Sequence, residues 1–181
     1  MSQINRLSTE ARIDKNKVIN FTFNGRKLQG YQGDTLAAAL LANGVDVVGR
    51  SFKYGRPRGI VGHGAEEPNG IMQLGSGAAT VPNVKATQVE LYEGLEAKSV
   101  NGWPSVNFDI MGVMGAFGRL MPPGFYYKTF MYPKKFWMTY EHFIRKAAGL
   151  GSTPVEADPD VYDKLHQHCD VLVVGAGPAG L

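Results

Sequence analysis

The chain has 181 residues, of which 44% are hydrophobic and 19% are charged, and its net charge at pH 7 is +3. This length allows one domain or a domain with an extension, and so mild a charge gives no reason to expect nucleic acid or a membrane surface as a partner. The single cysteine, Cys169, closes no internal disulfide and cannot supply the roughly four thiolates of an iron–sulfur cluster. We therefore expect no iron–sulfur cluster and a reducing cytoplasm as the compartment.

Residues 1–15 are expected to be an N-terminal extension. The sequence MSQINRLSTEARIDKNK has no apolar core of a secretory signal. Elsewhere, no apolar run approaches the roughly 18 residues that a membrane helix needs. We therefore expect a protein that is neither secreted nor embedded in a membrane.

A β-hairpin is predicted near the start of residues 16–100. In VINFTF (18–23) the apolar side chains of Ile19, Phe21 and Phe23 alternate with the others, the period of a half-buried strand. Asn24-Gly25 follows, and this dipeptide is the strongest short hairpin signal because both residues tolerate positive φ. Residues 26–31 are expected to return as the second strand.

A helix and a second pair of strands are predicted after this hairpin. LAAALLA (36–42) is a strong helix former, with Asp34 or Thr35 as the N-cap and Asn43-Gly44 as the stop. Residues 49–83 carry many breakers, and residues 87–92 and 95–100 look like two strands joined at Glu93-Gly94. A hairpin, a helix and late strands together indicate an α+β domain of the β-grasp, ferredoxin-like type.

Residues 101–168 read as a connecting arm and linker. Prolines interrupt the segment and aromatic side chains crowd it, including Phe125, Tyr126, Tyr127, Phe130, Tyr132, Phe136, Trp137, Tyr140 and Phe143. A helix is predicted over 140–148 with its end at Gly149, followed by a linker over 151–160 and a short helical turn over 162–168. With its neighbouring cations the arm could serve as a platform for single-stranded nucleic acid, but we favour a packing arm that covers another domain or subunit.

Residues 169–181 have the pattern with which a Rossmann-type NAD- or FAD-binding domain begins. Val171–Val174 is a continuous apolar run, as in a buried parallel strand, and GAGPAG follows it directly. In the pattern G-x-G-x-x-G the first glycine makes the turn, the second admits a pyrophosphate and the third lets the helix pack closely. The predicted cofactor-binding residues are Gly175, Ala176, Gly177, Pro178, Ala179 and Gly180.

The dinucleotide pattern is incomplete within these 181 residues. A complete site also needs the crossover helix and an acidic residue about 20 positions farther on, which would bind the ribose. We therefore expect the chain to be a fragment of a longer polypeptide, and we expect it to bind NAD poorly by itself.

Two further clusters each allow a functional and a structural interpretation. Arg50, Lys53, Arg56 and Arg58 could bind a phosphate or carboxylate, or could pair with nearby acids such as Glu66 and Glu67; charge alone favours the pairing. In GHGAEEPN (62–69) a histidine and two carboxylates could form a metal or acid–base site, but a solvated loop is the simpler interpretation. We likewise expect His142, His166 and His168 to lie at the surface.

Together these stretches resemble the alpha-subunit family of heterotetrameric sarcosine oxidases, over nearly the whole chain. The resemblance rests on GDTLAAALLANG (33–44), RSFKYGRPRGI (50–60), GAEEPNGIMQLG (64–75), PNVKATQVELYEGLEAKSVNGWPS (82–105), GFYYKTFMYPKKFW (124–137), IRKAAGLG (144–151) and DVLVVGAGPAGL (170–181).

The resemblance implies a function for the whole complex. Such enzymes oxidise sarcosine to glycine, form hydrogen peroxide, and can transfer the methyl carbon to tetrahydrofolate, which the missing C-terminal part of this subunit would handle. The alpha subunit would assemble with beta, gamma and delta subunits, with FAD and FMN in the complex and NAD on Gly175, Gly177 and Gly180.

The resemblance also bears on two loops and on catalysis. Related domains that hold a cluster have cysteines in the loop equivalent to 60–69, which has none here, and most relatives have His where Gly55 stands. We assign no catalytic residue and no metal site to this chain, and expect the isolated chain to be inactive. The alternative is a free-standing β-grasp interaction module that docks a partner through its aromatic arm.

Overall fold

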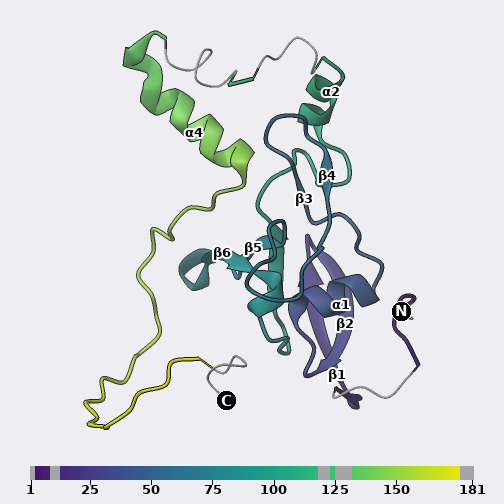
Figure 1. Cartoon of the computed structure of the whole chain (residues 1–181), viewed down its shortest axis with the longest axis vertical. Helices are drawn as coiled ribbons and strands as arrows, with labels where there is room; N and C mark the ends of the chain where they lie inside the picture. Colours follow the sequence, from purple (N-terminus) through teal and green to yellow (C-terminus); the bar gives the residue numbers. More distant parts are fainter. Residues whose placement is uncertain (1–2, 9–12, 118–122, 125–131, 176–181) are drawn as a thin grey trace.

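A computed structural model describes residues 3–8, 13–117, 123–124 and 132–175, and these contain one larger sheet (Figure 1). Its five strands are β1 (Asp14–Phe23), β2 (Arg26–Gln32), β5 (Ile71–Leu74), β6 (Val81–Lys85) and β7 (Glu96–Ser99). They lie in the order β2-β1-β7-β5-β6, with β1 and β7 parallel and the other neighbours antiparallel. The sheet is therefore mixed, and the predicted α+β class is confirmed.

The first two strands form the predicted hairpin. Asn24 and Gly25 have φ of 49° and 78°, so both central residues of the turn adopt the left-handed conformation that this dipeptide tolerates. Phe21 faces Leu28 across the hairpin, and both side chains are buried. The alternation in the sequence therefore correctly predicted that Phe21 and Phe23 lie on the buried face of β1.

Helix α1 (Leu36–Ala42) has the predicted bounds and lies beside the hairpin (Figure 1). The hydroxyl of Thr35 accepts a hydrogen bond from the backbone N–H of Ala38 at 3.1 Å, which caps the helix start. Gly44, with φ of 71°, follows its end. Leu36 and Leu40 are fully buried, and burial of each such side chain contributes about 1.5–3 kcal/mol. The core also includes Phe21, Phe23, Leu28, Met72, Leu91, Leu95 and Ala97.

The second predicted strand pair is only partly correct. β7 forms within 95–100, but it pairs in parallel with β1 rather than with residues 87–92. Residues 87–92 form no named strand: they follow a 3₁₀ turn (Ala86–Gln88) and make one bridge, Glu90 with Thr35. No strand was predicted in residues 49–83, which carry many breakers, but β5 forms there and β6 begins there and ends at Lys85.

Residues 3–8 of the N-terminal extension contact the sheet domain. Two nitrogens of the Arg6 guanidinium donate to the carboxylate of Asp34 at 3.1 and 2.6 Å, and the Asp34 side chain is only 3% exposed. The backbone N–H of Asn5 also donates to the carbonyl of Ala42 at 3.1 Å. The extension is therefore held on the domain by a bidentate ion pair and by the end of α1.

The later elements are β3 (Gly49–Arg50), β4 (Pro57–Arg58), α2 (Ile110–Ala116) and α4 (Trp137–Ala148). As predicted, α4 ends at Gly149, whose φ is 77°, although the helix begins three residues earlier than expected. It extends away from the sheet (Figure 1), and its C-terminal end is tied to the domain where the N–H of Gly151 donates to Asn83 at 2.9 Å. The prediction of a helical turn over 162–168 is wrong: the structure describes these residues, and they have no regular secondary structure. Within the described ranges, no helix has the length and apolarity to cross a membrane.

Candidate functional site

The predicted dinucleotide fingerprint falls at the edge of what the structure describes. Gly175 has a φ of 108°, whereas Ala176, Gly177, Pro178, Ala179 and Gly180 lie outside the described residues. The residues before them, Val171 to Val174, form no strand and are between 60% and 88% exposed. The prediction of a buried parallel strand is therefore not met in this chain, because such a strand needs paired neighbours and none of the described strands pairs with these residues.

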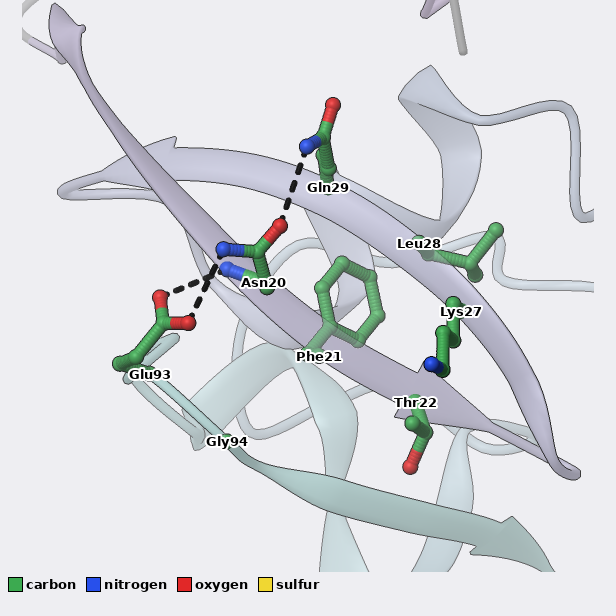
Figure 2. A pocket seen from close by; sticks show the side chains of 8 residues that line it. All are labelled: Asn20, Phe21, Thr22, Lys27, Leu28, Gln29, Glu93 and Gly94. Carbon is green, nitrogen blue, oxygen red and sulfur yellow. Dashed lines mark hydrogen bonds between the residues drawn. The ribbon is translucent and has the colours of Figure 1, made fainter.

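A hollow of about 500 Å³ lies beside the β1–β2 hairpin. Figure 2 shows the side chains that line it. The backbone N–H and the side-chain amide of Asn20 donate to the carboxylate of Glu93 at 2.8 and 3.0 Å, and the amide oxygen accepts from Gln29 at 3.0 Å. Hydrogen bonds from the Asn20 backbone and side chain lower the pKa of Glu93 from its ordinary value. The side chains of Gln29, Asn20 and Glu93 thus hydrogen-bond to one another, and none of them is an activated nucleophile.

The loop over residues 60–70 is organised around one buried carboxylate. Glu67 is 0% exposed, and its Oε2 accepts the N–H of Val61 at 2.8 Å and the N–H of Gly62, while its Oε1 accepts the N–H of Asn69 at 2.7 Å. Burial acts to raise the pKa of Glu67, but these backbone N–H groups outweigh it, so the pKa is lowered. Glu67 is therefore an internal anion that closes the loop, a role that its position in the sequence did not reveal.

The neighbouring carboxylate of Glu66 lies in water. It accepts the N–H groups of His63 and Gly64 at 3.1 and 3.0 Å, which helps to lower its pKa, and its Oε1 lies 3.2 Å from Nδ1 of His63. The His63 side chain is fully exposed. Among the described residues, no group of three or more His, Cys, Asp or Glu could hold a metal ion. The carboxylates of Glu66 and Glu67 and the imidazole of His63 thus do not form a common metal site in the described structure.

The guanidinium group of Arg50 joins two loops. It donates to the carbonyls of Val106 at 2.6 Å, Gly55 at 3.0 Å and Asn107 at 2.8 Å. The side chain of Asn101 bonds both backbone groups of Arg50, accepting its N–H at 2.8 Å and donating to its carbonyl at 2.7 Å. Arg50 is therefore a fixed cation, held by carbonyl oxygens that do not neutralise its charge.

For Arg50, Arg56 and Arg58, the pairing with Glu66 and Glu67 that charge alone favoured is not found in the described structure. In the part of the chain that the structure describes, the cations of Arg50, Arg56 and Arg58 form no ion pair. Arg56 instead lies over the ring of Tyr54, with its guanidinium carbon 4.8 Å from the ring centre. The structural interpretation is therefore not supported for these three arginines, because Glu67 binds backbone N–H groups and Glu66 lies beside His63.

Helix α2 packs against the basic loop at a glycine contact. A Cβ added to Gly55, whose φ is 58°, would lie 2.5 Å from the backbone nitrogen of Gly112. A Cβ added to Gly115 would lie 2.4 Å from the carbonyl oxygen of Tyr54. Where most relatives were expected to carry His, this structure therefore has no space for a side chain. Beside this contact lies a second hollow, of about 470 Å³.

The arm exposes much of its apolar surface. None of the residues of α4 is buried, and Trp137, Met138 and Phe143 are 43%, 75% and 65% exposed. Trp103 and Phe108 near α2 are also largely exposed. Residues Phe125, Tyr126, Tyr127 and Phe130 lie outside the described residues. In the described part of the arm, these apolar side chains therefore lie on the surface.

The remaining candidates are isolated on the surface. His142, His166, His168 and Cys169 are all exposed, as expected for residues without a shared site. Cys169 is the one cysteine in the sequence, and no His, Asp or Glu group forms a ligand set with it among the described residues.

The fold class of the first domain is given by a family match. Residues 16–102 match the family described as "2Fe-2S iron-sulfur cluster binding domain". The expectation of a domain without an iron–sulfur cluster is therefore contradicted, because the family model that matches this domain describes cluster binding.

The side chains of the matched residues do not fit cluster ligation of the usual kind. Iron–sulfur clusters are held by cysteine thiolates, and residues 16–102 contain no cysteine. Glu67, not a thiol, fills the interior of the 60–70 loop. Residues 16–102 therefore offer no thiolate ligand to a cluster.

Three similar proteins indicate the family of the chain. The chain is 56% identical over 177 residues to "Sarcosine oxidase subunit alpha" of Rhizobium meliloti (strain 1021), covering 97% of this chain and 18% of that protein. It is 32% identical to proteins of the same name from Corynebacterium sp. strains U-96 and P-1, covering 100% and 96% of this chain and 15% and 13% of theirs. The chain belongs to the family of sarcosine oxidase alpha subunits, and it spans less than a fifth of the length of these relatives.

One solved structure is also similar in part. The crystal structure of L-proline dehydrogenase from P. horikoshii matches 50% of this chain and 16% of its own, with 26% identity and a TM-score of 0.36. That TM-score is too low to establish a common fold.

Proposed function

We propose that this chain is the N-terminal part of the alpha subunit of a sarcosine oxidase complex. Such a complex demethylates sarcosine oxidatively to glycine, forms hydrogen peroxide and passes the methyl carbon to tetrahydrofolate. The identity of 56% to the Rhizobium meliloti alpha subunit over 97% of the chain carries this proposal. In it, residues 16–100 form a scaffold domain and residues 101–168 a connecting arm.

Residues 169–181 begin the NAD site of the complex. Gly175 makes the turn after the apolar run, Gly177 admits the pyrophosphate, and Gly180 allows a helix to pack closely, with Ala176, Pro178 and Ala179 between them. The positive φ of Gly175 supports a turn at this point. NAD would bind through backbone N–H groups, for which these small residues leave space.

Beta, gamma and delta subunits are the proposed partners, in the cytoplasm, with FAD and FMN in the whole complex. The exposed apolar side chains of α4 support docking against another part of this assembly. The described residues of this chain contain no activated nucleophile, so we assign it positioning of the assembly rather than catalysis.

Activity and cofactor content test the two parts of this proposal separately. The isolated chain should form no peroxide from sarcosine, and turnover by it would contradict the assigned role. In the whole complex, Gly177→Val should remove bound NAD, because its side chain fills the space of the pyrophosphate, while the control Ala65→Val in an exposed loop should leave NAD in place. NAD content is measured after denaturation of the purified complex, and unchanged NAD in Gly177→Val would refute the site.

A further inference from the structure

The hollow between the basic loop and α2 combines fixed positive charge with apolar walls. It has a volume of about 470 Å³, within the range of small-molecule sites. Its lining includes the cations of Arg50 and Arg56, the rings of Tyr54 and Phe108, and the side chain of Val113.

The guanidinium group of Arg50 is held in place before any ligand arrives, and that of Arg56 lies against an aromatic ring. Three backbone carbonyls fix Arg50, and of its five N–H donors these bonds use three. Arg56 lies over the ring of Tyr54, and its backbone N–H donates to the hydroxyl of Ser51 at 2.9 Å. Because less side-chain freedom remains to be lost, a ligand that binds here has a smaller entropic cost.

The charge of the hollow is not balanced from within the described chain. Asp109 is the carboxylate in the lining, and its Oδ1 accepts the N–H groups of Trp103 at 3.1 Å and Met111 at 3.2 Å. It forms no ion pair with Arg50 or Arg56. An anion from outside would therefore complete the site.

We propose that this hollow binds a small phosphomonoester that carries a planar ring. Guanidinium groups match the oxygens of a phosphate with paired hydrogen bonds. The exposed ring of Phe108 offers apolar contact to a flat body, whereas the ring of Tyr54 supports the guanidinium of Arg56. This site is separate from the glycine fingerprint at 175–180, and it does not depend on the function proposed above.

Calorimetric titration of the 181-residue chain with AMP, adenosine and inorganic phosphate tests this inference. AMP should bind with saturation, phosphate more weakly, and adenosine not at all, because the charge supplies most of the attraction. Arg56→Gln should weaken AMP binding about tenfold or more, since it removes a charge-assisted interaction. Arg26→Gln, at an exposed arginine that begins β2, is the matched control and should leave the affinity unchanged.

A second pair of variants distinguishes this hollow from the fingerprint. Gly177→Val should not alter AMP binding, whereas Phe108→Leu should reduce the affinity for AMP towards that for phosphate, because it removes the exposed ring of the lining. Several outcomes would overturn the proposal: no saturable AMP binding at millimolar concentration, equal binding of adenosine, or equal losses in Arg56→Gln and Arg26→Gln. AMP binding that Gly177→Val abolishes would instead assign the ligand to the fingerprint and would also refute the hollow.

Discussion

Replacement of Glu67 by Gln is the sharpest test of how the 60–70 loop is held. The two side chains have the same shape, but the carboxylate accepts three backbone N–H groups, from Val61, Gly62 and Asn69. Whichever way a glutamine amide is turned, its NH₂ group faces at least one of these donors. The variant therefore loses a charge-assisted hydrogen bond and buries an unsatisfied N–H, for which we expect a loss of about 2–4 kcal/mol in the free energy of unfolding.

The loss should depend on pH in a defined direction. The folded-state pKa of Glu67 lies below its ordinary value of 4.5, so the folded state holds its ionised form more strongly than the unfolded chain does. The stabilisation is therefore complete above the unfolded pKa and disappears as pH falls through the folded pKa. The stability difference between wild type and Glu67→Gln should be constant near neutral pH and should shrink in acid.

Urea unfolding followed by far-ultraviolet circular dichroism, at neutral and at acid pH, measures both effects. Glu66→Gln is the matched control, because it makes the same chemical change one residue earlier on a side chain that is 60% exposed. A Glu67→Gln variant within about 0.5 kcal/mol of wild type would refute this account of the loop, as that is the range of ordinary surface changes. A loss equal to that of Glu66→Gln, or one that grows in acid, would refute it equally.

Two other contacts make separate predictions. Gly55→Ala should destabilise the chain by about 2–4 kcal/mol and raise hydrogen exchange in α2, since it adds a backbone clash to the strain of a positive φ; Gly25→Ala, with no atom within 4 Å, should cost only about 1–2 kcal/mol. Equal losses would show that α2 does not pack as described. Arg6→Gln should cost about 2–3 kcal/mol and expose residues 3–8 to proteolysis, because it leaves the buried carboxylate of Asp34 without its cation. Unchanged proteolysis at these residues would mean that the ion pair does not hold the extension.

Local signals were enough to predict the first half of the sheet domain. The Asn24-Gly25 turn, the alternation before it and the alanine- and leucine-rich run at 36–42 each act within a few residues, and the structure confirms all three. The end of α4 at Gly149 is likewise set by one residue with a positive φ.

Elements that depend on distant contacts could not be predicted in this way. Helix α2 contains Gly112 and Gly115, which are poor helix formers, and the reason for them is the approach of the basic loop about 55 residues earlier. Residues 87–92 have strand-like composition, but their carbonyl and N–H groups bond to the start of α1 instead of to β7. Composition cannot show which neighbour a segment will have.

The candidate sites also differ in whether neighbouring residues in the sequence are enough to reveal them. The glycine fingerprint is visible in six consecutive residues. The hollow beside α2 joins Arg56 to residues around Phe108, about fifty positions apart, and nothing in either segment indicates the other. The cysteine count predicted no iron–sulfur cluster, whereas the family model that matches this domain describes cluster binding. Such a model rests on the whole sequence pattern and not on one ligand type.

The most direct test of the central claim is to purify the complex that contains this chain within its whole alpha subunit, and to measure peroxide formation with sarcosine. The account predicts peroxide and glycine in equal amounts, in a preparation in which the alpha subunit elutes together with its partner subunits. An intact complex that forms no peroxide from sarcosine would contradict the function proposed here.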